Sequence, residues 1–136
     1  MNQRTLKTLI AAALVLGLLL SMCSIAFAQE RMITSTTSSF VRDSSTKGTA
    51  TVAAHSSNAN TPYMKSKMTL QEAPLGTNNF VNSNVTPKTK TTSYSSILHT
   101  ETFTITTTKE YRVKIEITDN TKGTDYTVTI YEDLQE

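Results

Sequence analysis

The sequence predicts an all-β fold, an antiparallel β-sandwich of about seven or eight short strands, with a small barrel as the alternative. Three observations predict this fold class. Several short segments alternate apolar and polar side chains, which is typical of strands that bury one face. Turn-forming residues separate these segments. Beyond residue 28, no segment has a helical apolar stripe longer than about two turns, and the frequent threonines disfavour helix because branching at Cβ restricts χ1.

The first 28 residues have the layout of a secretory signal peptide, which predicts an N-terminal signal helix. Arg4 and Lys7 precede an uncharged apolar run, and Ala26-Phe27-Ala28 places small residues where signal peptidase recognises its cleavage site. We therefore expect cleavage after Ala28 and a secreted, extracellular protein. Residues 29–136 have the length of one ordinary domain, so we expect a single β-sandwich there.

Two other interpretations of the N-terminus remain open. Leu20-Ser21-Met22-Cys23 resembles a bacterial lipobox, and lipidation of Cys23 would tether the protein to a membrane. Met22 is larger than the residue normally accepted before that cysteine. The uncharged run from Thr8 to Ala28 is also long enough, at about 1.5 Å per residue, to remain as an uncleaved membrane anchor.

Charge limits the classes of partner that we expect, and cysteine content bears on disulfide bonds. Arg4 and Lys7 account for the formal net charge of +2, so their removal leaves 11 basic residues against 11 acidic ones. A balanced chain has no field to attract nucleic acid or an anionic membrane, and we expect neither as a partner after cleavage. The only cysteine, Cys23, leaves with the signal peptide, which predicts a disulfide-free domain.

In chain order, the alternation predicts strands at residues 32–41, 50–54, 63–71, 79–82, 92–98, 102–106, 109–118 and 126–130. The clearest pair is the last one. Turn residues 119–123 join it, which predicts an antiparallel hairpin. Its inner face should form the main wall of the core, with Tyr111, Val113, Ile115, Ile117, Tyr126, Val128 and Ile130.

Four short motifs carry a resemblance to a known group: Gly48-Thr49-Ala50-Thr51-Val52, Met68-Thr69-Leu70-Gln71, Thr104-Ile105-Thr106 and Glu110-Tyr111-Arg112-Val113-Lys114. Their order resembles small secreted immunoglobulin-like proteins of Gram-positive bacteria, most of which have no assigned function. The resemblance covers about residues 47–118 and implies an immunoglobulin-like sandwich. The chain lacks the tryptophan often found after the Leu-Gln strand, where Phe80 can fill the same packing role. We also predict that Tyr111 bonds a nearby backbone group to fix a corner.

The sequence predicts no catalytic residue, no cofactor and no metal site. The only histidines, His55 and His99, lie in no recognisable catalytic or zinc motif, and we expect both to be exposed on loops or strand ends. Residues 119–125 offer oxygen ligands for Ca²⁺, but Lys122 places a positive charge among them. We therefore predict that the protein is not an enzyme. A hydrolase would require one histidine beside a carboxylate and a hydroxyl.

Pairs of threonines two positions apart recur along the chain, at Thr34/Thr36, Thr49/Thr51, Thr102/Thr104/Thr106 and Thr127/Thr129. Strand alternation places the members of each set on one face. Such an array can match a regular surface such as ice or a polysaccharide. The alternative is that threonine is simply a preferred solvent-facing strand residue.

These observations predict a secreted, non-enzymatic module with a binding or structural role toward an unknown protein or glycan at the cell surface. The alternative is a carbohydrate- or cell-wall-binding domain, which needs exposed aromatic side chains. Tyr131 and Phe40 are the candidate binding residues because both lie on the polar phases of their strands.

Overall fold

The computed structural model describes residues 33–57, 63–121 and 124–136. The predicted signal peptide, its cleavage site after Ala28 and the lipidation candidate Cys23 lie outside the described residues. So does Lys122 in the predicted turn. Within the described part of the chain, no helix is long and apolar enough to cross a membrane.

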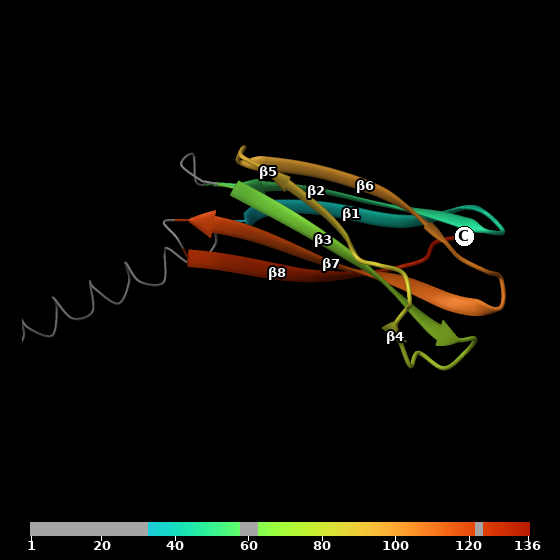
Figure 1. The fold of residues 1–136 in the computed structure, drawn as a ribbon. Helices are drawn as coiled ribbons and strands as arrows, with labels where there is room; N and C mark the ends of the chain where they lie inside the picture. The colour runs from blue at the N-terminus through green and yellow to red at the C-terminus, as the bar shows by residue number, and fades with distance from the viewer. Residues whose placement is uncertain (1–32, 58–62, 122–123) are drawn as a thin grey trace, which may run out of the picture. The chain divides into compact units, whose positions relative to one another are not determined.

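The described residues form eight strands in two antiparallel sheets, which confirms the all-β prediction (Figure 1). One sheet has the order β1-β2-β6. The other has the order β4-β3-β7-β8, and β5 also pairs with β3. The strands are β1 (Ile33–Ser44), β2 (Lys47–Ser56), β3 (Tyr63–Pro74), β4 (Val81–Asn82), β5 (Lys88–Thr92), β6 (Ser96–Thr104), β7 (Lys109–Thr121) and β8 (Thr124–Asp133).

Two elements differ from those predicted from the sequence. Residues 88–92 form β5, although Asn82 to Lys90 was expected to be turn-rich; β5 pairs with the first half of β3 and β4 with its second half. Parts of the segments expected at 92–98 and 102–106 are joined in one strand, β6, which pairs with β2 from Lys47 to His55.

The two sheets bury one shared apolar core, as expected for a sandwich. Alternate residues of the central strands β2, β3 and β7 point into it, because successive side chains of a strand face opposite sides. The rings of Phe40 and Phe103 meet edge to face, with their centroids 6.2 Å apart. Each large apolar side chain that is fully buried here contributes about 1.5–3 kcal/mol relative to exposure.

Gly48 marks the tightest point of the core. It lies on the inner face of β2, where a Cβ atom would stand 2.9 Å from a ring carbon of Phe40. The same atom would lie 3.2 Å from Ile105 and 3.3 Å from Leu134. The absence of a side chain at Gly48 therefore allows the Phe40 ring to pack close to the strand.

The predicted hairpin is confirmed, but its two strands contribute unequally to the core. The inward residues of β7 are almost completely buried, from Tyr111 to Ile117. In β8, Tyr126 is 37% exposed, and Val128 and Ile130 are half-buried. Because β8 is the edge strand of its sheet, fewer residues cover it. The prediction that both strands form the main wall is therefore right only for β7.

The prediction that Phe40 is an exposed binding residue is wrong, because its side chain is 0% exposed and packs in the core. The register of β1 against β2 shifts between Ile33 and Ser35. This irregularity reverses the alternation, so Ile33 and Phe40 both pack against the core although an odd number of positions separates them. Phe40 thus has a structural role.

The predicted bond of Tyr111 is confirmed. The backbone N–H of Thr106 donates a hydrogen bond to the Tyr111 hydroxyl, with an N–O distance of 3.2 Å. The Thr106 hydroxyl also lies 3.2 Å from that oxygen. These contacts fix the corner between β6 and β7, which forms part of the site described next.

Candidate binding site

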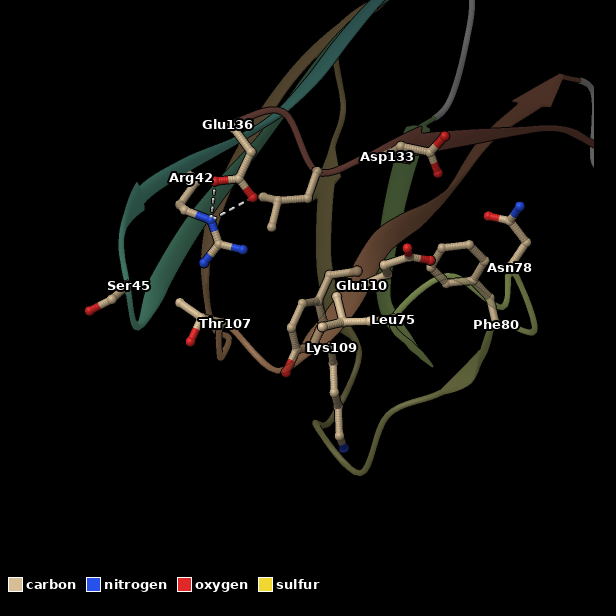
Figure 2. A pocket seen from close by; sticks show the side chains of 12 residues that line it. Arg42, Ser45, Leu75, Asn78, Phe80, Thr107, Lys109, Glu110, Asp133 and Glu136 are labelled. Atoms are coloured by element: carbon tan, nitrogen blue, oxygen red, sulfur yellow. Dashed lines mark hydrogen bonds and ion pairs between the residues drawn. The ribbon is translucent and has the colours of Figure 1, made fainter.

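A hollow of about 720 Å³ lies at one end of the sandwich (Figure 2). The turn between β1 and β2, the loop after β3, the corner before β7 and the C-terminal residues line it. Figure 2 shows the pair formed by Arg42 and Glu136 on one side and Phe80 on the opposite side. Phe80 lines this hollow and contacts Arg112, which in turn contacts Tyr131. We call the hollow, together with these three side chains, the loop-end site.

The last residues of the chain build one wall of the loop-end site. Gln135 donates its N–H to the Phe40 carbonyl and accepts from the Arg42 N–H, both at 2.9 Å. Arg42 Nε lies 2.8 and 2.9 Å from the two carboxylate oxygens of Glu136. The Nη1 atom of Arg42 is buried and has no hydrogen-bond partner among the described residues. The wall is therefore held together by the backbone bonds of Gln135 and by the Arg42–Glu136 pair.

The loop after β3 builds the opposite wall. Gly76 and Asn78 have positive φ angles of 76° and 52°, which glycine and asparagine tolerate best. The N–H of Gly76 donates to Glu110 Oε1 at 2.8 Å, and the Thr77 hydroxyl donates to the Pro74 carbonyl at 2.8 Å. These bonds hold the loop against β7 and present Phe80 to the hollow.

Arg112 of β7 lies between two aromatic rings. Its Cζ atom is 4.3 Å from the ring centroid of Phe80 and 4.6 Å from that of Tyr131. Its Nε donates to Gln71 Oε1 at 2.7 Å, and the Gln71 amide donates to Asn82 Oδ1 at 2.8 Å. Cation–π attraction therefore holds the Phe80 and Tyr131 rings against Arg112, while the bond from Nε to Gln71 orients the guanidinium.

Tyr131 is 52% exposed, as predicted, and Arg112 links it to Phe80. Sequence reasoning gave Phe80 only a packing role and named Arg112 only as part of a short motif. Their contact joins a loop to a strand distant in sequence, so alternation alone gave no signal for it.

Charges of both signs surround the hollow. Arg42 and Lys109 are cationic, whereas Glu110, Asp133 and Glu136 are anionic. Lys109 Nζ donates to Glu72 Oε1 at 2.8 Å, and this hydrogen bond raises the pKa of Lys109, which keeps its ammonium charged. The site thus combines aromatic faces, fixed donors and carboxylate acceptors. Such a combination suits a ring-shaped ligand with hydroxyl and charged groups.

The prediction that both histidines are exposed is wrong for His99, which is 2% exposed. Because β6 is one continuous strand, His99 falls in phase with the inward residues Ile97 and Phe103. Its Nδ1 lies 3.0 Å from Ser66 Oγ, and its Nε2 lies 3.2 Å from Glu101 Oε1. This is the residue set of a hydrolase, but Ser66 is fully buried and cannot meet a substrate in this conformation.

The other polar candidates are accounted for separately. His55 is exposed near the end of β2, and its Nδ1 lies 2.8 Å from Ser96 Oγ. Asp119, a candidate Ca²⁺ ligand, is buried and accepts a hydrogen bond from the Ser56 hydroxyl. In the part of the chain that the structure describes, no three potential ligands are grouped to hold a metal ion.

Comparisons with known proteins leave the chain without an assigned family. No family model matches the sequence, and no curated protein matches it. One similar solved structure is the solution structure of a protein provisionally described as a late embryogenesis abundant (LEA) protein. It shares 12% sequence identity over 93% of this chain and 85% of that chain, with a TM-score of 0.45. We draw no conclusion on fold or function from a likeness at this level.

Proposed function

We propose that the protein acts outside the cell as a non-enzymatic β-sandwich module that binds a cell-surface glycan carrying charged groups, and that the loop-end site holds this glycan. One observation carries the proposal: the Arg112 guanidinium lies between Phe80 and the half-exposed Tyr131, beside a hollow lined by charges of both signs. The proposal favours the carbohydrate- and wall-binding alternative over a purely structural role.

The chemistry of a glycan matches these groups. The C–H face of a sugar ring packs on an exposed aromatic ring such as Tyr131, which keeps a polar edge in water. Sugar hydroxyls donate to carboxylates such as Glu110 and Asp133. Carboxyl or amino groups on the glycan find Arg42 or Glu136 within the same hollow.

The proposal places the domain among the immunoglobulin-like sandwiches and outside the cell. The Tyr111 bond to the Thr106 backbone, at the start of the strand that precedes the last one, supports the first part. The layout of residues 1–28 supports the second. Intact-mass measurement of the exported protein tests the second part, because a chain that does not begin at Gln29 contradicts cleavage after Ala28.

Binding is tested by sedimentation with insoluble peptidoglycan, whose amino sugars carry charged peptides. We expect Tyr131→Ala and Arg112→Leu each to weaken binding by about tenfold or more, because truncated tyrosine and arginine anchors typically cost over 1 kcal/mol. Tyr94→Ala is the matched control, since Tyr94 is 76% exposed outside the loop-end site and should bind like the unmodified protein. Equal binding by all three variants would contradict the proposal.

A further inference from the structure

The outer face of the β1-β2-β6 sheet differs from the loop-end site in its residues and in its charge. It consists of the alternate, outward residues of segments 35–41 in β1, 49–55 in β2 and 96–102 in β6, and we call it the hydroxyl face. None of these residues is Lys, Arg, Asp or Glu. Threonine and serine predominate. Of the threonines noted in the sequence, Thr49 of β2 lies beside Thr102 of β6, and Thr51 lies beside Thr100.

Cross-strand contacts order these hydroxyl groups. Thr51 Oγ1 lies 3.2 Å from Thr100 Oγ1, and Thr49 Oγ1 lies 3.1 Å from Thr102 Oγ1. Thr49 donates its proton to Asp43 at 2.6 Å, so Thr102 is the donor within its own pair. A hydroxyl has one donor and two acceptor positions, so both pairs keep bonding capacity toward solvent. A ligand would therefore meet hydroxyls that are already oriented, which lowers the ordering cost of binding.

A hollow of about 480 Å³ interrupts the hydroxyl rows. It lies where the small side chain of Ala53 stands in register between Thr37 and Leu98. The exposed Leu98 gives it an apolar wall, and His55, held by Ser96, lies at one end. The hollow thus joins an apolar surface to hydrogen-bonding groups, which is what one sugar ring requires.

We propose that the hydroxyl face is a second binding site, which takes a neutral polysaccharide chain with one sugar ring seated over Ala53. A charged ligand would lose hydration there, and the outward residues of the three segments offer no opposite charge; the adjoining Asp43 carboxylate already accepts a hydrogen bond from Thr49. An ice surface would need the same hydroxyl pattern in each row, and the apolar Ala53 row breaks that pattern. The proposal goes beyond the loop-end site and stands without it, because different residues of a different sheet carry it.

The test is sedimentation with chitin and amorphous cellulose, two insoluble and uncharged probes. We expect Ala53→Leu, which fills the hollow, to weaken adsorption by about tenfold, and Thr51→Lys to do the same. Thr127→Lys is the matched control because Thr127 is an exposed strand threonine of the other sheet. Tyr131→Ala should leave this adsorption unchanged. Raising NaCl from about 0.05 M to about 0.5 M should change it by less than about twofold, since no ion pair is involved.

Circular dichroism shows whether each variant is folded. If Ala53→Leu unfolds the domain, Thr100→Val decides, because it removes a hydroxyl and keeps the branched shape; it must weaken adsorption more than Thr127→Val does. No adsorption by the unmodified protein overturns the proposal, as does an equal loss in Thr127→Lys. Thermal hysteresis in freezing solution without adsorption to either polysaccharide also overturns it, in favour of ice.

Discussion

The two outer faces of the sandwich pair their polar side chains in different ways, one through charges and the other through hydroxyl groups. On the face of β3, β7 and β8, Glu116 lies 3.0 Å from Lys114 Nζ and 3.8 Å from Lys67 Nζ. On the hydroxyl face, threonines occupy the equivalent cross-strand positions and bond each other. Both patterns satisfy polar groups above the same core. The comparison teaches that alternation fixes which residues face outward, whereas the choice between charge and hydroxyl sets the class of ligand each face can take.

The largest expected effect comes from overpacking the core that lies beneath both outer faces. Gly48→Val would place methyl groups against Phe40, Ile105 and Leu134 at a point already too close for a Cβ atom. We expect a loss of unfolding free energy at or above the upper end of the about 1–3 kcal/mol typical of overpacking, measured by urea denaturation. Thr49→Val, one position along on the outer face, is the control. Similar losses in both variants would contradict the packing described for Gly48.

A smaller effect concerns the polar contacts that link the sheets inside the core. Ser66 belongs to β3 and His99 to β6, so their contact joins the sheet of one face to the sheet of the other. Ser66→Ala leaves His99 Nδ1 without this partner, and we expect a loss of about 1–2 kcal/mol in thermal or urea unfolding. Binding at the loop-end site and at the hydroxyl face should persist below the melting temperature. Loss of binding in the folded variant would show that Ser66 acts on a ligand.

A direct comparison of the faces uses one cross-strand contact from each. Glu116→Gln removes the ion pairs with Lys67 and Lys114, and Thr100→Val removes the hydroxyl contact with Thr51. Each should cost about 0.2–1 kcal/mol of unfolding free energy. About 0.5 M NaCl should abolish the cost of Glu116→Gln because salt screens exposed charges, and should leave that of Thr100→Val unchanged. If the costs of the two variants depended equally on salt, the contrast between a charged contact and a hydroxyl contact would be contradicted.

The smallest expected effect is a change in the pKa of Tyr63, the first residue of β3. The hydroxyl of Tyr63 donates to Asp125 Oδ1 at 3.1 Å, and this hydrogen bond raises the pKa of Tyr63. The stabilising contribution is therefore present below the ordinary tyrosine pKa of about 10 and is lost as pH rises through the raised value. Absorbance titration near 295 nm should show that Asp125→Asn lowers this pKa. An unchanged titration curve would contradict the bond.

Much of the fold could be predicted because alternation is uninterrupted in strands such as β7, the longest of those described. The inward residues of β7, such as Val113 and Ile115, are buried as predicted. Alternation failed where a strand departs from regular pairing, as at the register shift before Phe40. It also failed for His99, because the continuity of β6 depends on pairing with β2 rather than on its own residues.

The candidate sites could be predicted only one strand at a time. The exposure of Tyr131 follows from its phase in β8, and the outward position of Thr51 follows from its phase in β2. The neighbours of these residues depend on register between distant segments. The contact of Arg112 with Phe80 and that of Thr51 with Thr100 both depend on such register, which a single sequence does not contain.

The register shift in β1 also bears on how the length of this chain can vary. Ile33 and Phe40 both reach the core only because the strand contains one residue more than regular pairing needs. Deleting Thr34 would give a regular strand with both side chains still inward. Deleting Ser38, in the regular part, would turn the outward Thr37 inward instead. Single-residue gaps among homologous domains are therefore expected at the shift near Thr34 and not a few positions later.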